Sequence, residues 1–182
     1  MLTGKTTLVG LIGNPIAGSL SPRMQNAAFA ARGLDWAYVP LPVEEGRLEE
    51  AVTGLVALGF AGANVTIPYK TRVLAFCDEL DPVAERAGSV NTLLVRQGRV
   101  LGSSTDGEAV SGAVEVAGRR ALVLGAGGAA QAVARALLDA GAGEVVLVAR
   151  RPEPAHALKL RLLTGSPEAR VAVAEGWPPL GL

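Results

Sequence analysis

The chain has 182 residues, of which 49% are hydrophobic, so it can form a buried core in one large domain or two small ones. Its 17 Lys and Arg residues balance 17 Asp and Glu residues without any basic stretch, which favours small-molecule partners over nucleic acid or a membrane surface. No apolar run is long enough to span a membrane and the N-terminus has no signal-peptide pattern, so we expect a cytoplasmic protein.

The first part of the chain alternates apolar runs of strand type with Ala-rich helical runs. We predict strands at Leu8–Ile12, Trp36–Leu41 and Gly62–Thr66. The runs between them predict helices at Pro22–Arg32 and Glu44–Leu58. This alternation is typical of an α/β fold with parallel strands.

The middle of the chain predicts a strand pair and a connecting helix. Val90–Arg96 and Val100–Gly102 flank a short turn and are predicted to form a hairpin. Gly107–Val116 is predicted to be helical.

A glycine-rich motif of dinucleotide-binding type follows an apolar strand at residues 121–124. A helical pattern through Leu138 and a second strand, Glu144–Ala149, come after it. Glycines in this position allow a tight turn and a close approach of backbone to phosphate, and the helix N-terminus attracts the negative charge. The predicted cofactor-binding residues are Gly125, Ala126, Gly127, Gly128, Ala129 and Ala130.

The end of the second strand indicates which dinucleotide is bound. An enzyme that uses NAD carries a carboxylate there for the ribose hydroxyls, whereas this chain has Arg150 and Arg151. Two guanidinium groups can bind a 2′-phosphate, so the sequence favours NADP, with Arg150 the stronger candidate. The alternative is a solvated basic strand end.

The remainder of the chain predicts a helix at Ala155–Leu163 and a strand at Arg170–Ala174. A complete dinucleotide-binding domain has two βαβ halves, so this chain is expected to contain one half. Such an open sheet exposes an edge and an apolar face, which favours a homodimer, aggregation or low stability.

Metal and disulfide chemistry are not expected. Cys77 is the only cysteine and His156 the only histidine, which leaves no pattern for a zinc site or an internal disulfide. His156 lies in a polar helical segment and is interpreted as a surface residue.

Polar residues interrupt the apolar pattern where the early strands meet helices, the usual position of ligand sites in α/β folds. Ser19 and Ser21 follow the first strand, and Asn64, Thr66 and Lys70 lie at and after the third. Ser21 precedes Pro22 and could simply cap a helix, and Lys70 could be solvent-exposed. Two further candidates lie beyond them: Asn91, and Asp106, which could simply cap a helix at Gly107.

These segments together resemble the shikimate dehydrogenase family. The resemblance rests on five ordered motifs between Leu8 and Arg151: G-N-P-I-x-x-S-x-S-P, G-x-N-V-T-x-P-x-K, G-[AS]-x-N-T, x-T-D-G and G-A-G-G-A-[AS]. It implies a substrate-binding α/β domain, residues 1–106, followed by a partial Rossmann NADP-binding domain, residues 107–182. It also implies a C-terminally shortened chain, because family members continue with a segment beside the nicotinamide and a C-terminal helix that packs on the substrate domain.

The resemblance further implies residue roles and a reaction, the reversible NADP-dependent reduction of 3-dehydroshikimate to shikimate. Lys70 and Asp106 match the family's catalytic pair, and we expect Lys70 to transfer the proton while Asp106 orients it. Alternatives remain open: a non-catalytic module that binds shikimate or NADP, or an enzyme that prefers quinate. By motif, the implied substrate-binding residues are Ser19, Ser21, Asn64, Thr66, Lys70, Asn91 and Asp106.

The chain departs from the family pattern at several positions. Many members have His in place of Gly18 and Gln25, and Asn in place of Ser104. None of these differences removes a candidate catalytic residue. The common Asn-Arg-Thr of the cofactor site is here Ala149-Arg150-Arg151, which keeps one arginine and adds another.

Overall fold

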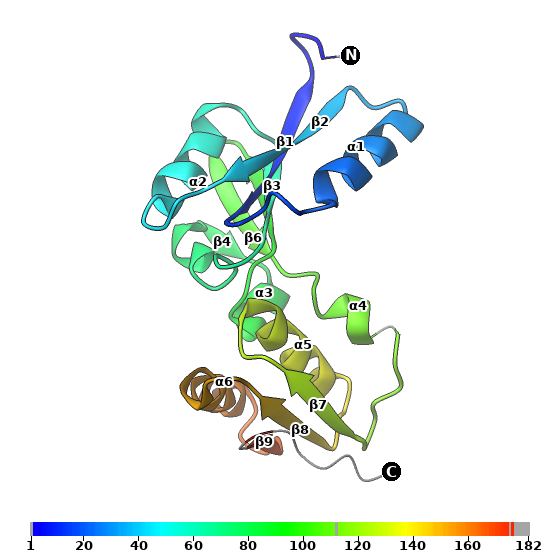
Figure 1. The fold of residues 1–182 in the computed structure, drawn as a ribbon, viewed down its shortest axis with the longest axis vertical. Coiled ribbons are helices and arrows are strands. Elements are labelled where there is room, and N and C mark those ends of the chain that lie inside the picture. The colour runs from blue at the N-terminus through cyan, green and yellow to red at the C-terminus, as the bar shows by residue number, and fades with distance from the viewer. Residues whose placement is uncertain (1, 112, 175, 177–182) are drawn as a thin grey trace. The chain divides into compact units, whose positions relative to one another are not determined.

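The computed structural model describes residues 2–111, 113–174 and 176, and its contacts divide the chain into two compact units (Figure 1). The first unit comprises residues 1–81 and 90–103, and the second comprises residues 82–89 and 104–182. The sequence predicts two domains with a single boundary, 1–106 and 107–182. The units differ from that division because residues 82–89 pack with the C-terminal part of the chain.

The first unit is built on a six-stranded sheet with the strand order β2-β1-β3-β5-β6-β4. Three helical segments accompany the sheet: α1 (Ser21–Ala31), α2 (Leu48–Ala57) and the 3₁₀ helix η1 (Val73–Phe76). Its strands are β1 (Thr7–Gly13), β2 (Trp36–Pro42), β3 (Gly62–Val65), β4 (Glu79–Leu80), β5 (Thr92–Arg96) and β6 (Arg99–Ser103).

The sheet is mixed. β1 pairs parallel with both β2 and β3, as the alternation of strands and helices predicts, but β5 pairs antiparallel with β3 and with β6. β3 and β5 approach closely at Gly62, where an added Cβ would collide with the Leu93 carbonyl. Val65 and Leu93 are buried at 2% exposure each, so both strands contribute to the core of this unit.

The second unit contains a three-stranded sheet in the order β7-β8-β9, in which both neighbouring pairs are parallel. Its core includes Val145 and Leu147 of the central strand, which are fully buried. The strands are β7 (Arg120–Leu124), β8 (Glu144–Val148) and β9 (Val171–Val173), and the helices are α3 (Pro82–Ala87), α4 (Glu108–Ser111), α5 (Gly128–Asp139) and α6 (Pro152–Gly165).

Some local predictions were wrong. The helix expected at Gly107–Val116 is limited to α4, since residues 113–116 are not helical. The β-branched residues Val110, Val114 and Val116 lower helix propensity in this segment. The helix expected from Glu44 begins at Leu48, because Gly46 has a φ of +89° and forms a turn instead.

Candidate functional site

The first candidate site lies at one edge of the six-stranded sheet, where β1 and β3 end and β5 begins. β1 and β3 run in the same direction and β5 runs in the opposite one. The register pairs Ile12 with Val65 and Asn64 with Thr92. The residues that follow β1 and β3, and those that precede β5, therefore meet at a single edge of this unit.

Ser19 and Ser21 lie in the segment that follows β1. This segment is anchored by the buried side chain of Ile16, and the Ser19 N–H donates to the Ile16 carbonyl at 2.9 Å. The Ser21 N–H donates to the Ser19 Oγ at 3.3 Å. Ser21 does not cap α1, because the helix begins at Ser21 itself and no side-chain capping bond is present at its start.

Thr66 and Lys70 bound the turn that follows β3. The Thr66 N–H donates to the Ile12 carbonyl at 2.8 Å, and the Thr66 carbonyl accepts from the Tyr69 N–H at 2.9 Å. The Lys70 carbonyl accepts from the Val90 N–H at 2.8 Å, which joins this turn to the segment that carries Asn91. Lys70 is half-buried, which differs from the solvent-exposed position considered as its alternative.

Asn64 and Asn91 belong to one hydrogen-bond network at this edge. The Asn64 Nδ2 donates to the Asn91 carbonyl at 3.3 Å and to the Thr92 Oγ1 at 3.2 Å, and the Thr92 hydroxyl donates to the Asn91 Oδ1 at 2.9 Å. The Tyr38 hydroxyl donates to the Asn64 Oδ1 at 2.8 Å. The structure thus brings together the two asparagines predicted for the site.

Sequence reasoning missed Tyr38 and Thr92 as parts of this network. Thr92 stands in the G-[AS]-x-N-T motif, which was a usable signal. Tyr38 lies in an apolar strand and is 4% exposed, so it reads as an ordinary core residue until its hydroxyl partner is known.

Asp106 belongs to the second unit, near the start of α4, and is half-buried. Lys70 belongs to the first unit. The predicted pairing of Asp106 with Lys70 therefore stays a prediction.

The second candidate site is the turn between β7 and α5. Gly125 has a φ of +108°, which favours glycine, and its N–H donates to the Val148 carbonyl at 2.7 Å. Gly127 occupies the capping position of α5 with extended backbone, and an added Cβ there would meet nothing within 4 Å. The turn also contains Ala126, and the 12-residue helix α5 begins with Gly128, Ala129 and Ala130, so small side chains leave its start accessible to an anion.

Arg150 and Arg151 follow β8, the strand next to β7. Both side chains are exposed, and Arg151 takes the capping position of α6 with extended backbone. They lie at the carboxyl end of the sheet, the same end as the glycine turn, because β7 and β8 are parallel. The arrangement fits a dinucleotide whose adenosine ribose carries a phosphate.

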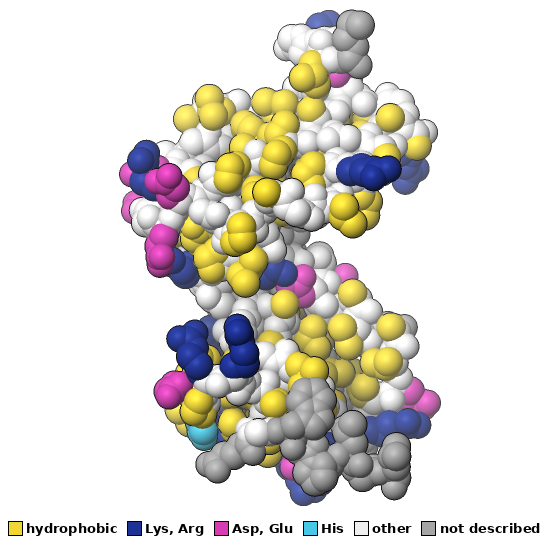
Figure 2. Space-filling view, in the orientation of Figure 1, with side chains coloured by type: hydrophobic (Ala, Val, Ile, Leu, Met, Phe, Trp, Pro, Cys, Tyr) yellow, Lys and Arg dark blue, Asp and Glu magenta, His cyan; other side chains and the backbone are white. Residues whose placement is uncertain are grey.

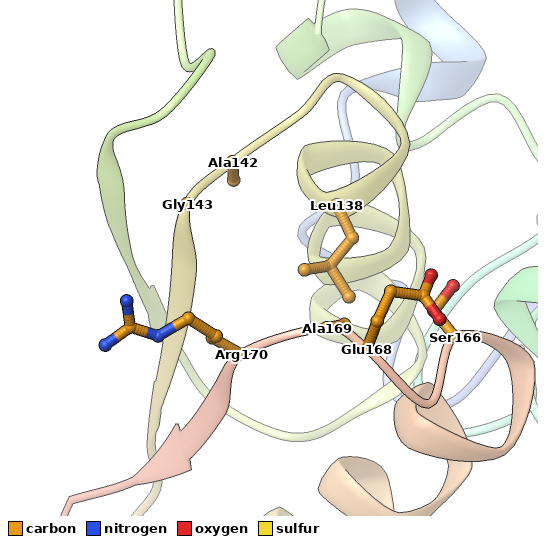
Figure 3. Close-up of a pocket in the computed structure, with 7 residues that line it drawn as sticks. All are labelled: Leu138, Ala142, Gly143, Ser166, Glu168, Ala169 and Arg170. Atoms are coloured by element: carbon orange, nitrogen blue, oxygen red, sulfur yellow. The ribbon is translucent and has the colours of Figure 1, made fainter.

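A cavity of about 250 Å³ at the opposite end of this sheet is not a comparable site (Figure 3). It is lined by residues that precede β8 and β9, among them Ala142, Gly143 and Ser166. Figure 3 shows Leu138 pointing into it and Arg170 pointing away. Ligands of open α/β sheets bind at the carboxyl ends of the strands, and these are the amino ends.

Three further observations concern His156, metal ligands and membrane-spanning helices. His156 is exposed on α6, and its Nδ1 lies 2.9 Å from the Pro152 carbonyl, which confirms the surface position predicted for it. Within the described ranges, no three or more His, Cys, Asp or Glu side chains are grouped as metal ligands would be. No helix in that part of the chain has the length and apolar character that crossing a membrane requires.

Comparison with known proteins gives the family. Residues 11–93 match the model of the shikimate dehydrogenase substrate binding domain. The chain belongs to the shikimate dehydrogenase family. The NADP(+) shikimate dehydrogenase of Rubrobacter xylanophilus is 52% identical over 167 residues, which cover 88% of this chain and 59% of that relative. This member of the family therefore spans about 60% of the length of the curated relatives it matches.

Solved structures agree with the family assignment. Shikimate dehydrogenase from Thermus thermophilus, in complex with NADP(H) and shikimate, superimposes with a TM-score of 0.77 at 36% identity, covering 91% of this chain and 62% of that one. Quinate dehydrogenase from Corynebacterium glutamicum, in complex with NAD, gives a TM-score of 0.82 at 28% identity, covering 93% of this chain and 64% of that one. The shikimate dehydrogenase fold thus also carries a quinate enzyme.

Proposed function

We propose that this chain carries the substrate site and the NADP-binding half-domain of a shikimate dehydrogenase, which reversibly reduces 3-dehydroshikimate to shikimate. The observation that carries the proposal is that the ends of β1 and β3 and the start of β5 meet at one sheet edge, since these strand ends and the adjoining segments contain six of the implied substrate residues. They are Ser19, Ser21, Asn64, Thr66, Lys70 and Asn91.

The chemistry of this edge suits a polyhydroxylated acid. Hydroxyl groups of Ser19, Ser21 and Thr66 can donate to a carboxylate or accept from ring hydroxyls, and side-chain amides can do both. The Lys70 ammonium adds a positive charge at the same edge. We assign these residues to binding and orienting shikimate.

Proton transfer is assigned to Lys70. In the reductive direction the substrate carbonyl carbon gains a hydride, the C=O π pair moves to oxygen, and the Lys70 ammonium gives that oxygen a proton. In the oxidative direction the neutral amine takes the proton back. Asp106 is assigned to orienting Lys70 and binding a substrate hydroxyl.

The cofactor proposal rests on the glycine turn and the two arginines. The backbone of Gly125, Gly127 and Gly128 would hold the pyrophosphate, and Arg150 with Arg151 would hold the 2′-phosphate. When bound, NADPH supplies the hydride.

Absorbance of reduced nicotinamide tests the function directly. The purified 182-residue chain is mixed with shikimate and NADP, and parallel reactions contain NAD or quinate. We expect NADP reduction with shikimate and its sharp loss in Lys70→Ala with NADP binding kept. Unchanged turnover in Lys70→Ala would contradict the assignment, faster reaction with quinate and NAD would favour the quinate alternative, and shikimate binding without turnover would indicate a binding module.

Two further parts of the proposal concern setting and assembly. We propose a cytoplasmic location, since the reaction draws on a soluble dinucleotide and a soluble acid. We also propose that the chain forms a homodimer, which light scattering coupled to gel filtration would test.

A further inference from the structure

Tyr38 is a core residue whose hydroxyl reaches the candidate substrate site. It is 4% exposed and packs in the cluster of Leu11 and Ile16. The Asn26 side chain binds its backbone on both sides, accepting from the Tyr38 N–H at 2.9 Å and donating to the Tyr38 carbonyl at 2.8 Å. Packing therefore holds the ring, and Asn26 of α1 holds the backbone that carries it.

The direction of each hydrogen bond in the network follows from one group that can only accept. The Asn91 main-chain carbonyl has no proton, so the group of Asn64 that faces it must be the Nδ2. The Asn64 Oδ1 then faces Tyr38, which must donate. Thr92 accepts from the Asn64 Nδ2, so its single proton goes to the Asn91 Oδ1.

We propose that Tyr38 is a positioning residue of the substrate site, whose hydroxyl holds the Asn64 amide and, through Thr92, orients the side chain of Asn91. This inference rests on the proposed function, because it presumes that the edge binds shikimate. Without the hydroxyl, the Asn64 Oδ1 loses its donor, and the amide that supports Thr92 and Asn91 is held at one side only. Tyr38 need not touch the ligand to affect binding.

The Tyr38 hydroxyl stays protonated, so it stays a hydrogen-bond donor to Asn64. Burial raises the pKa of Tyr38 to about 12, so the hydroxyl keeps its proton throughout the neutral range. The orientation of the network is therefore expected not to change between pH 6 and 9, because that whole range lies about three pH units or more below the pKa of Tyr38.

The test compares two tyrosines that each lose a buried hydroxyl bonded to one partner. Tyr38→Phe removes the bond to Asn64, whereas the control Tyr69→Phe removes a 2.7 Å bond to the Val43 carbonyl, which involves no side chain of the network. Calorimetry with the 182-residue chain is expected to show shikimate affinity about tenfold lower in Tyr38→Phe and nearly unchanged in Tyr69→Phe. NADP affinity is expected to stay unchanged in both.

A double variant separates positioning from general loosening of the core. In an Asn64→Ala background, Tyr38→Phe should change shikimate affinity by less than about twofold, because its partner is already absent. Equal affinity of Tyr38→Phe and the unmodified chain, or a full tenfold effect without Asn64, would overturn the proposal.

The ligand-free protein gives an independent readout. The side-chain amide NMR signals of Asn64 and Asn91, assigned with Asn64→Ala and Asn91→Ala, should both shift in Tyr38→Phe and stay in place in Tyr69→Phe. Unmoved signals would refute the positioning role. If the unmodified chain does not bind shikimate, the proposed substrate is wrong, and the NMR comparison still decides the role of Tyr38.

Discussion

Gly125 and Gly127 differ in their roles in the turn between β7 and α5, although both are glycines of one motif. Gly125 needs its φ of +108°, a conformation that side chains disfavour, whereas Gly127 has a φ of −82° and open space around its Cα. The first glycine is required by the backbone. The second leaves room for a ligand.

Alanine substitutions should separate these two roles. Gly125→Ala is expected to destabilise the chain by about 1–3 kcal/mol and also to weaken NADP binding. Gly127→Ala should leave the free energy of unfolding within about 0.5 kcal/mol and still weaken NADP binding, because its methyl group would occupy phosphate space. Urea unfolding and fluorescence titration with NADP measure both effects. Undiminished NADP binding in Gly127→Ala would argue against the phosphate cradle.

Arg150 is the side chain on which cofactor preference is expected to depend most. Loss of a charge-assisted bond to the 2′-phosphate should weaken NADP binding about tenfold or more in Arg150→Ala and leave NAD binding nearly unchanged. Arg170→Ala is the matched control, since Arg170 is also exposed but precedes β9, at the other end of the sheet (Figure 3). Parallel titrations with NADP and NAD give the ratio of the two affinities in each variant. Equal losses of affinity for both dinucleotides in Arg150→Ala would contradict the assignment.

At the scale of elements, α3 is joined to α5 by a cluster of charged side chains. Asp139 at the end of α5 pairs with Arg135 one turn earlier and lies 3.7 Å from the Nε of Arg86 in α3. Arg135 is 8% exposed, so its charge is largely removed from water and depends on Asp139. This cluster helps to explain why residues 82–89 pack with the second unit.

Removal of the charge on Asp139 should therefore be costly. Asp139→Asn is expected to lower the free energy of unfolding by about 1–3 kcal/mol, because Arg135 would stay buried without its counter-charge. The control Glu50→Gln removes the charge that pairs with Arg47. These two side chains are exposed, Arg47 at 65% and Glu50 at 62%, so the free energy of unfolding should change by less than about 1 kcal/mol. Urea unfolding of both variants makes the comparison, and equal effects would show that burial of Arg135 is unimportant.

Elements with a strong apolar pattern could be predicted, and short ones could not. The strands β1, β2, β3 and β8 and the helices α1 and α5 follow from periodicity and from the glycine turn. η1, β4 and α3 have between two and six residues, too few to show a period. Each packs against another element: η1 against α2, β4 against β6 and α3 against α5. Boundaries failed where a turn glycine such as Gly46 intervened.

The candidate site could be predicted residue by residue but not as a network. Ser19, Asn64 and Lys70 stand out because polar residues interrupt apolar runs. Tyr38 does not stand out, because the sequence of an apolar strand does not show which group the tyrosine hydroxyl will bond. The antiparallel pairing of β5 with β3 places Thr92 opposite Asn64. Sequence periodicity does not show strand direction, so this contact could not be predicted.

At the scale of the whole molecule, the free edge of β7 is the feature with the clearest consequence. In the part of the chain that the structure describes, β7 pairs only with β8, so its other edge presents unpaired backbone groups. A groove of about 530 Å³ lies beside it, with Val110, Val116 and Val133 among its lining residues. Figure 2 shows hydrophobic side chains over the region of α4 and β7.

Leu124 at the end of β7 is 57% exposed and extends this apolar surface. We expect the 182-residue chain to self-associate through this edge, with an apparent mass in light scattering that rises with concentration. Leu124→Lys should lower that mass toward the monomer, because a charged side chain at a strand edge opposes pairing. Leu160→Lys changes an equally apolar side chain, 67% exposed on α6, and should not. A chain that stays monomeric at all concentrations, or that responds equally to both substitutions, would show that a second copy does not cover the β7 edge.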